Sequence, residues 1–91
     1  MSRPTFLDFQ FDEVNRDEIA RHGLTDDQLL QVLDGKVAWT RNKRSGRGDY
    51  RVIGRDHGGL AITIIVERTP DPMIWRPVTA WSAEPHEEAR L

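Results

Sequence analysis

The sequence of 91 residues contains no cysteine, which excludes disulfide bonds, thiolate zinc sites and cysteine nucleophiles. It also has no long hydrophobic run, because the longest, residues 60–66, falls far short of the roughly 20 apolar residues that span a bilayer. The first four residues are not followed by the apolar core of a secretory signal. We therefore expect a cytoplasmic protein that has no contact with a membrane.

Motifs of the common enzyme classes are missing as well. There is no glycine-rich phosphate-binding loop, no HExxH zinc motif and no calcium-binding loop. The histidines are widely spaced and have no thiolate beside them, so the sequence predicts neither a metal site nor a cofactor. Two have ordinary structural explanations, since His57 lies in a glycine-rich turn and His86 in a polar tail. His22 lies at the end of a predicted helix, where an imidazolium interacts favourably with the helix dipole.

What remains is enough for one small folded domain, residues 1–91. Hydrophobic residues make up 37% of the chain and charged residues 31%, a balance typical of globular rather than disordered or membrane proteins. A chain of this size buries about 60–65% of its unfolded surface, which suffices for independent folding with little margin. No repeat, low-complexity tract or linker divides the sequence.

Two helices are predicted in the first third of the chain. Residues 12–22 are rich in charged side chains and are followed by a glycine, which is a common helix stop. Thr25 and Gln28 form a capping box that begins a second helix over residues 25–34, and Gly35 is expected to end it in the left-handed conformation. We expect this second helix to pack through a face formed by Leu29, Leu30 and Leu33.

Strands are predicted both before and after the two helices in the sequence. The phenylalanines of residues 6–11 indicate a first strand, and Pro77 in the last strand favours a sheet edge or a bulge. A four-residue glycine turn over residues 56–59 joins two of the later strands. This order predicts an α+β domain in which an N-terminal strand and two helices pack on a meandering antiparallel β-sheet. The four later strands are expected at residues 37–41, 50–55, 60–66 and 73–81.

The net charge of −2 hides an uneven distribution along the chain. Residues 1–35 carry three basic and eight acidic side chains, and residues 56–91 carry three basic and six acidic ones. Residues 36–55 carry seven basic side chains against one acidic, a net charge of +6. Such a cluster is typical of a surface that meets a polyanion or an acidic partner, although a solvated basic loop has the same composition.

Several of these arginines fall on predicted strands. Alternation places Arg51 and Arg55 on one face of the sheet, and Arg76 lies in the last strand. Guanidinium groups aligned on a sheet can grip phosphates bidentately, but they can equally pair with carboxylates of neighbouring strands, such as Glu67. The tryptophans are expected to pack in the core or on the sheet, or one exposed tryptophan stacks on an unpaired base. The candidate RNA-binding residues are Lys43, Arg44, Arg47 and Trp81.

Segments throughout the chain together resemble the BrnT-type toxins. Residues 11–12 (Phe-Asp) and 21–25 (Arg-His-Gly-Leu-Thr) are similar to the start of that family. Residues 50–55, which end in Ile-Gly-Arg, are similar to one of its strands, and so are the apolar residues 60–67 and the closing residues 75–81. The resemblance spans nearly the whole chain, although each motif is short.

The resemblance implies the fold of the RelE/ParE toxin superfamily and the activity of a metal-independent endoribonuclease that blocks translation. It implies two partners, RNA and an antitoxin with a ribbon-helix-helix DNA-binding domain, so that DNA is contacted only through the antitoxin. RNA cleavage of this kind uses the 2′-hydroxyl as nucleophile and needs a base, an acid and cations for the charge on the phosphoryl group. The candidate catalytic residues are His22, Arg51, Arg55 and Arg76.

The chain departs from the family pattern at three places. Trp81 stands where the family usually has a second arginine, residues 48–49 (Gly-Asp) where it often has Glu-Arg, and Glu18 where it has an asparagine. A non-catalytic RNA- or protein-binding domain of the same fold is therefore the alternative function. A housekeeping domain whose basic loop is only solvated is the third.

Overall fold

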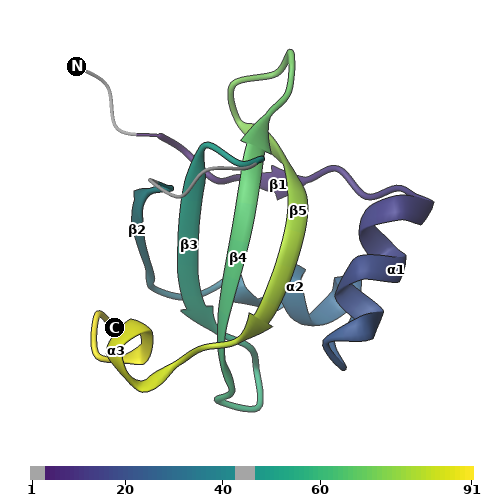
Figure 1. Ribbon diagram of the computed structural model, residues 1–91. Coiled ribbons are helices and arrows are strands. Elements are labelled where there is room, and N and C mark those ends of the chain that lie inside the picture. The colour runs from purple at the N-terminus through teal and green to yellow at the C-terminus, as the bar shows by residue number, and fades with distance from the viewer. Residues whose placement is uncertain (1–3, 43–46) are drawn as a thin grey trace.

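The computed structural model describes residues 4–42 and 47–91, and these form an α+β domain, as predicted (Figure 1). A short first strand is followed by two helices, four longer strands and a third helix. The elements are β1 (Asp8–Phe9), α1 (Glu13–Arg21), α2 (Asp26–Val32), β2 (Val37–Arg41), β3 (Tyr50–Arg55), β4 (Ala61–Arg68), β5 (Ile74–Ser82) and α3 (Pro85–Glu88).

The five strands form one mixed sheet in the order β1-β5-β4-β3-β2. Strands β2 to β5 form the antiparallel meander that the sequence predicts. The prediction gave the first strand no partner, and β1 joins the sheet by pairing with β5 in parallel through Asp8 and Phe9. Because the rest of the chain separates β1 from β5, no tight hairpin forces these two strands to run in opposite directions.

Helix α2 covers one face of the sheet, which we call the helix face, and passes behind the sheet in Figure 1; α1 lies beside β5 and contributes Ile19 to the core of that face. Leu29 and Val32 of α2 are fully buried, and Leu33 packs against the core. Leu30, in contrast, is 37% exposed, so its predicted place on the packing face is wrong. A helix turns about 100° per residue, so the residues three and four positions after Leu29 return to the face that meets the sheet. Leu30, one position after Leu29, points away from that face.

Both main helices begin with a capping box. The predicted box of α2 is confirmed. The backbone N–H of Gln28 donates to Thr25 Oγ1 at 3.2 Å, and the backbone N–H of Thr25 donates to Gln28 Oε1 at 3.0 Å. Helix α1 begins in the same way, with Asp12 and Asn15 exchanging two hydrogen bonds of 2.9 Å. The box of α1 went unpredicted because asparagine is not the usual residue at its third position.

The two helices end differently from one another. Gly23 follows α1 with φ +74°, the left-handed conformation expected of that glycine. Helix α2 stops at Val32 with Leu33 as a right-handed cap, and Gly35 does not adopt a positive φ. The prediction of a left-handed cap at Gly35 is therefore wrong, because the chain leaves α2 before reaching the glycine.

Pro77 of the last strand satisfies both parts of its prediction. Strand β1 pairs with β5 only at Ile74 and Trp75, so among the described residues no strand pairs with β5 at Pro77 on the side away from β4. The bulge is also observed, since the pairing of β4 with β5 shifts between Ile65 and Val66, opposite Pro77.

The end of the chain corrects the sequence reading. Residues 85–88 form α3 rather than a tail, and α3 contacts β3 and β4 from the side opposite α2 (Figure 1).

Candidate functional site on the arginine face

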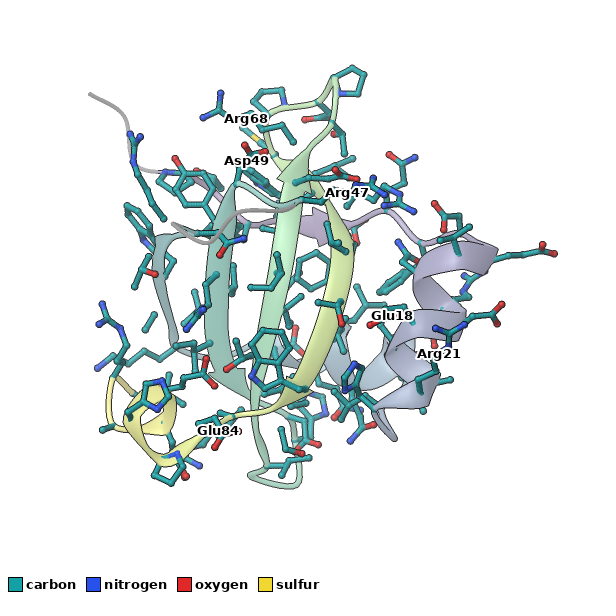
Figure 2. The ribbon with its side chains drawn as sticks, viewed as in Figure 1. Glu18, Arg21, Arg47, Asp49, Arg68 and Glu84 are labelled. Atoms are coloured by element: carbon teal, nitrogen blue, oxygen red, sulfur yellow. The ribbon has the colours of Figure 1, made fainter. Side chains whose placement is uncertain are left out.

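The face of the sheet opposite α2 carries three of the predicted site arginines, and we call it the arginine face. The predicted alternation is observed, because Tyr50 and Val52 belong to the core of the helix face while Arg51 and Arg55 point the other way. Figures 1 and 2 are viewed onto this face. It comprises Arg51, Ile53 and Arg55 of β3, Thr63, Ile65 and Glu67 of β4, and Arg76, Thr79 and Trp81 of β5.

Both arginines of β3 are paired with carboxylates of α3. Arg51 Nη1 lies 3.0 Å from Glu87 Oε2, and the two side chains are only 16% and 3% exposed. Arg55 Nη1 lies 2.9 Å from Glu88 Oε2, with both side chains close to half exposed. Helix α3 therefore lies over this part of the face as an acidic cover, tightly at Arg51 and loosely at Arg55.

Arg76 is held by two carboxylates from different elements. It binds Asp12 bidentately at 2.8 and 3.1 Å, and its third nitrogen lies 2.9 Å from Glu67. The hydrogen bond to Asp12 is the main reason that the pKa of Arg76 is raised and that the pKa of the Asp12 carboxyl is lowered. Because Asp12 also caps α1, Arg76 ties the start of that helix to β5.

Glu87 is the most buried charged residue of the site. Burial opposes its ionisation, but hydrogen bonds from the Glu84 backbone and the Trp81 indole outweigh burial and lower the pKa of Glu87. The Glu84 N–H and the Trp81 Nε1–H donate to its Oε1 at 2.9 and 3.0 Å. The nearby Thr63 hydroxyl acts in the same direction without making a hydrogen bond of ordinary geometry.

A surface hollow of about 610 Å³ opens beside this network. It joins the end of α1, the end of β5 and the start of α3, segments that the sequence keeps far apart. One of its lining residues, Glu84, is labelled in Figure 2. The lining residues are His22, Trp81, Ser82, Glu84, His86 and Glu87.

The other predicted site residues are dispersed. Lys43 and Arg44 lie outside the described residues. Arg47 pairs with Glu67 at the end of the arginine face opposite Glu84 (Figure 2). His57 in the β3–β4 turn is not merely solvated, since its Nε2 lies 2.8 Å from Oδ2 of Asp34, which follows α2.

Sequence reasoning missed Asp12, Glu87 and His86 as members of the site. One signal of α3 was present in the sequence, because proline is common at the first position of a helix. Here Pro85 takes that position, Glu84 precedes it, and Glu87 follows two residues later. The pairing of Asp12 and Glu87 with the strand arginines depends on tertiary structure alone.

A comparison with models of known protein families and one with curated proteins find no match for the chain. Among residues 4–42 and 47–91, no group of three histidine, aspartate or glutamate side chains is arranged to hold a metal ion. In the same part of the chain, no helix is long and apolar enough to cross a membrane.

Proposed function

We propose that the chain is the toxin of a type II toxin–antitoxin pair, a RelE/ParE-like endoribonuclease that acts without a metal and blocks translation. The observation that carries the proposal is the gathering of Arg51, Arg55, Arg76 and Trp81 on one face of the sheet. Guanidinium groups bind phosphates bidentately, and an aromatic ring beside them stacks on an unpaired base. The segments that supply these side chains are the ones that resemble BrnT-type strands.

The chemistry fits what such a face supplies. Cleavage by the RNA 2′-hydroxyl needs a base, an acid and positive charge at the phosphoryl group, and arginines provide that charge permanently. Arg47 and Glu84 lie at opposite ends of the arginine face in Figure 2. A single strand of RNA would follow this direction, from Arg47 at one end to the hollow at the other.

The antitoxin would use the same surface. Acidic side chains already lie on it within the chain, because Glu87 and Glu88 pair with Arg51 and Arg55. An acidic segment of a ribbon-helix-helix antitoxin would satisfy the arginines in the same way and exclude RNA.

One observation favours the second candidate, a non-catalytic RNA- or protein-binding domain. Each strand arginine of the face is bound to at least one carboxylate, and Arg51 and Arg76 are only 16% and 17% exposed. Guanidinium groups held in this way hold the structure together, and their charge is partly neutralised before any RNA arrives.

The deciding experiment measures growth after induction and cleavage of single-stranded RNA by the purified chain in excess EDTA. We expect the wild-type chain to arrest growth and to cleave RNA without a metal. Arg55→Ala should reduce both at least tenfold, because the half-exposed guanidinium of Arg55 can contact a phosphate of RNA bound on the arginine face. Arg68→Ala is the matched control, since it removes the same charge from a strand position on the helix face, opposite Trp75. A harmless chain that cleaves no RNA would overturn the enzyme proposal in favour of the binding domain.

Binding itself has a separate signature. Each phosphate that is neutralised releases counterions, so RNA affinity should fall steeply as salt rises. Replacing Arg44 and Arg47 together should flatten the slope of log K against log salt by roughly one to two units. Fluorescence anisotropy with a labelled oligonucleotide measures the slope, and an affinity that ignores salt would contradict phosphate binding.

A further inference from the structure

A second hollow lies at the end of the sheet away from Glu84, between the N-terminal segment and the β4–β5 turn, and we call it the turn pocket. Its volume is about 450 Å³, within the range of pockets that hold small organic molecules. Figure 2 labels Arg68 at this end of the sheet and Glu84 at the other. The lining residues that the argument uses are Tyr50, Arg68, Pro70, Pro72, Met73 and Trp75.

The two walls of the turn pocket are tied to each other by hydrogen bonds. The Trp75 Nε1–H donates to the backbone carbonyl of Thr5 at 2.8 Å. The Leu7 N–H donates to the backbone carbonyl of Met73 at 3.0 Å. Two prolines in the β4–β5 turn restrict its backbone further. The pocket is therefore formed before any ligand arrives.

The hydroxyl of Tyr50 is a polar group of the turn pocket that the fold leaves unused. Tyr50 is only 8% exposed, and its ring packs edge-to-face on Trp75 with the centroids 5.2 Å apart. Among residues 4–42 and 47–91, no group forms a hydrogen bond with Tyr50 Oη, and the fully enclosed side-chain atom without a partner is Thr63 Oγ1 instead. The Tyr50 hydroxyl therefore opens onto the pocket, where it can donate to a ligand.

Arg68 carries a positive charge that no carboxylate of the described residues neutralises. The ion pairs formed within residues 4–42 and 47–91 do not include Arg68, whose side chain is exposed. The three strand arginines of the arginine face, in contrast, are all paired. The Arg68 guanidinium is therefore available to an anion, and its planar set of donors matches a carboxylate.

The strand register brings this guanidinium and the hydroxyl to the same side of the sheet. Arg68 lies opposite Trp75, and Tyr50 lies opposite Val66, two positions before Arg68. All four side chains therefore belong to the helix face. Diagonal neighbours on adjacent strands lie roughly 7–8 Å apart, a distance that long side chains span. Two donors from adjacent strands can thus reach one group of a ligand.

The β4–β5 turn supplies the apolar part of the pocket. Met73 is 48% exposed, and Leu7, which is bonded to it through the backbone, is also largely exposed. Exposed apolar side chains that lie together around a hollow are typical of a binding site. The flexible thioether of Met73 can fit against an aromatic ring, and Pro70 and Pro72 add rigid apolar surface beside it.

Two carboxylates lie near the pocket, and both are bound to the backbone. Asp71 Oδ1 accepts a hydrogen bond from the Met73 N–H at 2.9 Å, and Asp49 Oδ2 accepts one from the Arg68 N–H at 2.9 Å. These bonds hold the turn and the end of β4. A ligand bound through these carboxylates would be a cation rather than an anion, and experiment can distinguish the two.

We infer that the turn pocket binds a small aromatic carboxylate. The carboxylate accepts hydrogen bonds from the Arg68 guanidinium and the Tyr50 hydroxyl, and the ring packs on Met73 and the prolines of the turn. A carboxylate only accepts hydrogen bonds, so it matches two donors that have no acceptor within the described residues. The pocket lies on the other face of the sheet from the arginines proposed to bind RNA, so this inference does not depend on the proposed function.

The test uses the isotope-labelled full chain and three probes that share one ring system: 2-naphthoate, the neutral 2-naphthamide and the cationic 2-naphthylmethylamine. Each probe is titrated while the indole N–H resonance of Trp75 is followed by proton–nitrogen correlation NMR. That resonance is identified by elimination with Trp39→Phe and Trp81→Phe. We expect 2-naphthoate to shift it and to bind at least about tenfold more tightly than either analogue.

Two variants each remove one donor from the turn pocket. Arg68→Gln should weaken 2-naphthoate binding about tenfold and abolish its advantage over 2-naphthamide, and Tyr50→Phe should weaken it about threefold. Arg21→Gln is the matched control, since it removes an exposed arginine of α1, labelled in Figure 2, and should change the affinity less than about twofold. None of the three changes removes a buried apolar group, and the spectrum of each free variant confirms its fold.

Three results would each overturn the inference. The first is a Trp75 resonance that 2-naphthoate does not shift. The second is binding of the amide or the amine that equals or exceeds binding of 2-naphthoate. The third is an Arg68→Gln chain that binds 2-naphthoate as tightly as the wild type does. None of these measurements involves RNA, so failure here and failure of the proposed function are told apart.

Discussion

The two faces of the sheet are stabilised by different physical interactions. On the helix face, Val52, Ile62, Ile64 and Val66 are completely buried against α1 and α2, and burial of apolar surface is the main stabilising contribution. On the arginine face, guanidinium groups, carboxylates and α3 cover the same strands. The comparison teaches that one face of these strands serves folding, which leaves the other free to carry polar chemistry.

The aromatic residues divide in the same way. On the helix face, Tyr50 packs against Trp75, Phe6 and Trp39 with ring centroids 5.2 to 6.0 Å apart, all close to edge-to-face. On the arginine face Trp81 has an arginine rather than another ring beside it. A ring with a cation for a neighbour is suited to binding, whereas a ring in a closed cluster is suited to packing.

The largest effect is expected on the helix face. Leu29→Ala removes a fully buried side chain from α2 and should lower the free energy of unfolding by about 2–5 kcal/mol, because it leaves a cavity. Leu30→Ala on the same helix should cost less than about 1 kcal/mol, since Leu30 is partly solvated. Urea denaturation followed by tryptophan fluorescence measures both, and equal losses would contradict the packing of α2.

A smaller effect is expected from the ion pairs of α3. Glu87→Gln should lower the free energy of unfolding by about 2 kcal/mol, because it leaves the buried Arg51 without its counter-charge. Glu88→Gln removes the same charge from the exposed pair with Arg55 and should be nearly neutral. The same denaturation experiment compares the two, and a Glu87 variant as stable as the Glu88 variant would show that α3 does not hold the arginine face.

The smallest effect on stability comes from the ionised carboxylates of Asp12 and Glu18, and it is measured by lowering the pH. The pKa values of Asp12 and Glu18 are lowered in the folded chain, mainly by hydrogen bonds from Arg76 and Thr79, so these groups bind protons more readily when unfolded. Their stabilisation is complete above about pH 5 and is lost as the pH falls through the lowered values. The melting temperature should therefore fall on acidification, and Asp12→Asn should flatten that fall; a profile as steep as that of the wild type would contradict it.

Most of the secondary structure could be predicted because its signals are local. The Thr25–Gln28 box and the alternation of residues 50–55 depend only on neighbours in the sequence, and both are observed. The register of a helix against a sheet is not local, which is why Leu30 was placed in the core and Val32 was overlooked. Helix α3 has only four residues, too few for an apolar period to appear.

The strand arginines of the candidate site could be predicted, but their partners could not. The face of Arg51 and Arg55 follows from strand alternation, but their partners Glu87 and Glu88 are more than 30 residues away and come into contact only when α3 lies over the sheet. His86 was read as a tail residue for the same reason. Sequence patterns place side chains on a face, whereas contacts between distant segments need the folded chain.

The bulge of β5 at Pro77 determines which way its second half faces. Arg76 and Trp81 are five positions apart, and in a regular strand an odd separation puts two side chains on opposite faces. Their partners Glu67 and Thr63 are four positions apart on β4, so the bulge inserts one residue, Val78, and restores both side chains to one face. If Val78 instead took an ordinary position in the ladder, the indole would turn into the core and Ala80 toward solvent, so the bulge at this single extra residue is what keeps an arginine and an aromatic ring on one surface.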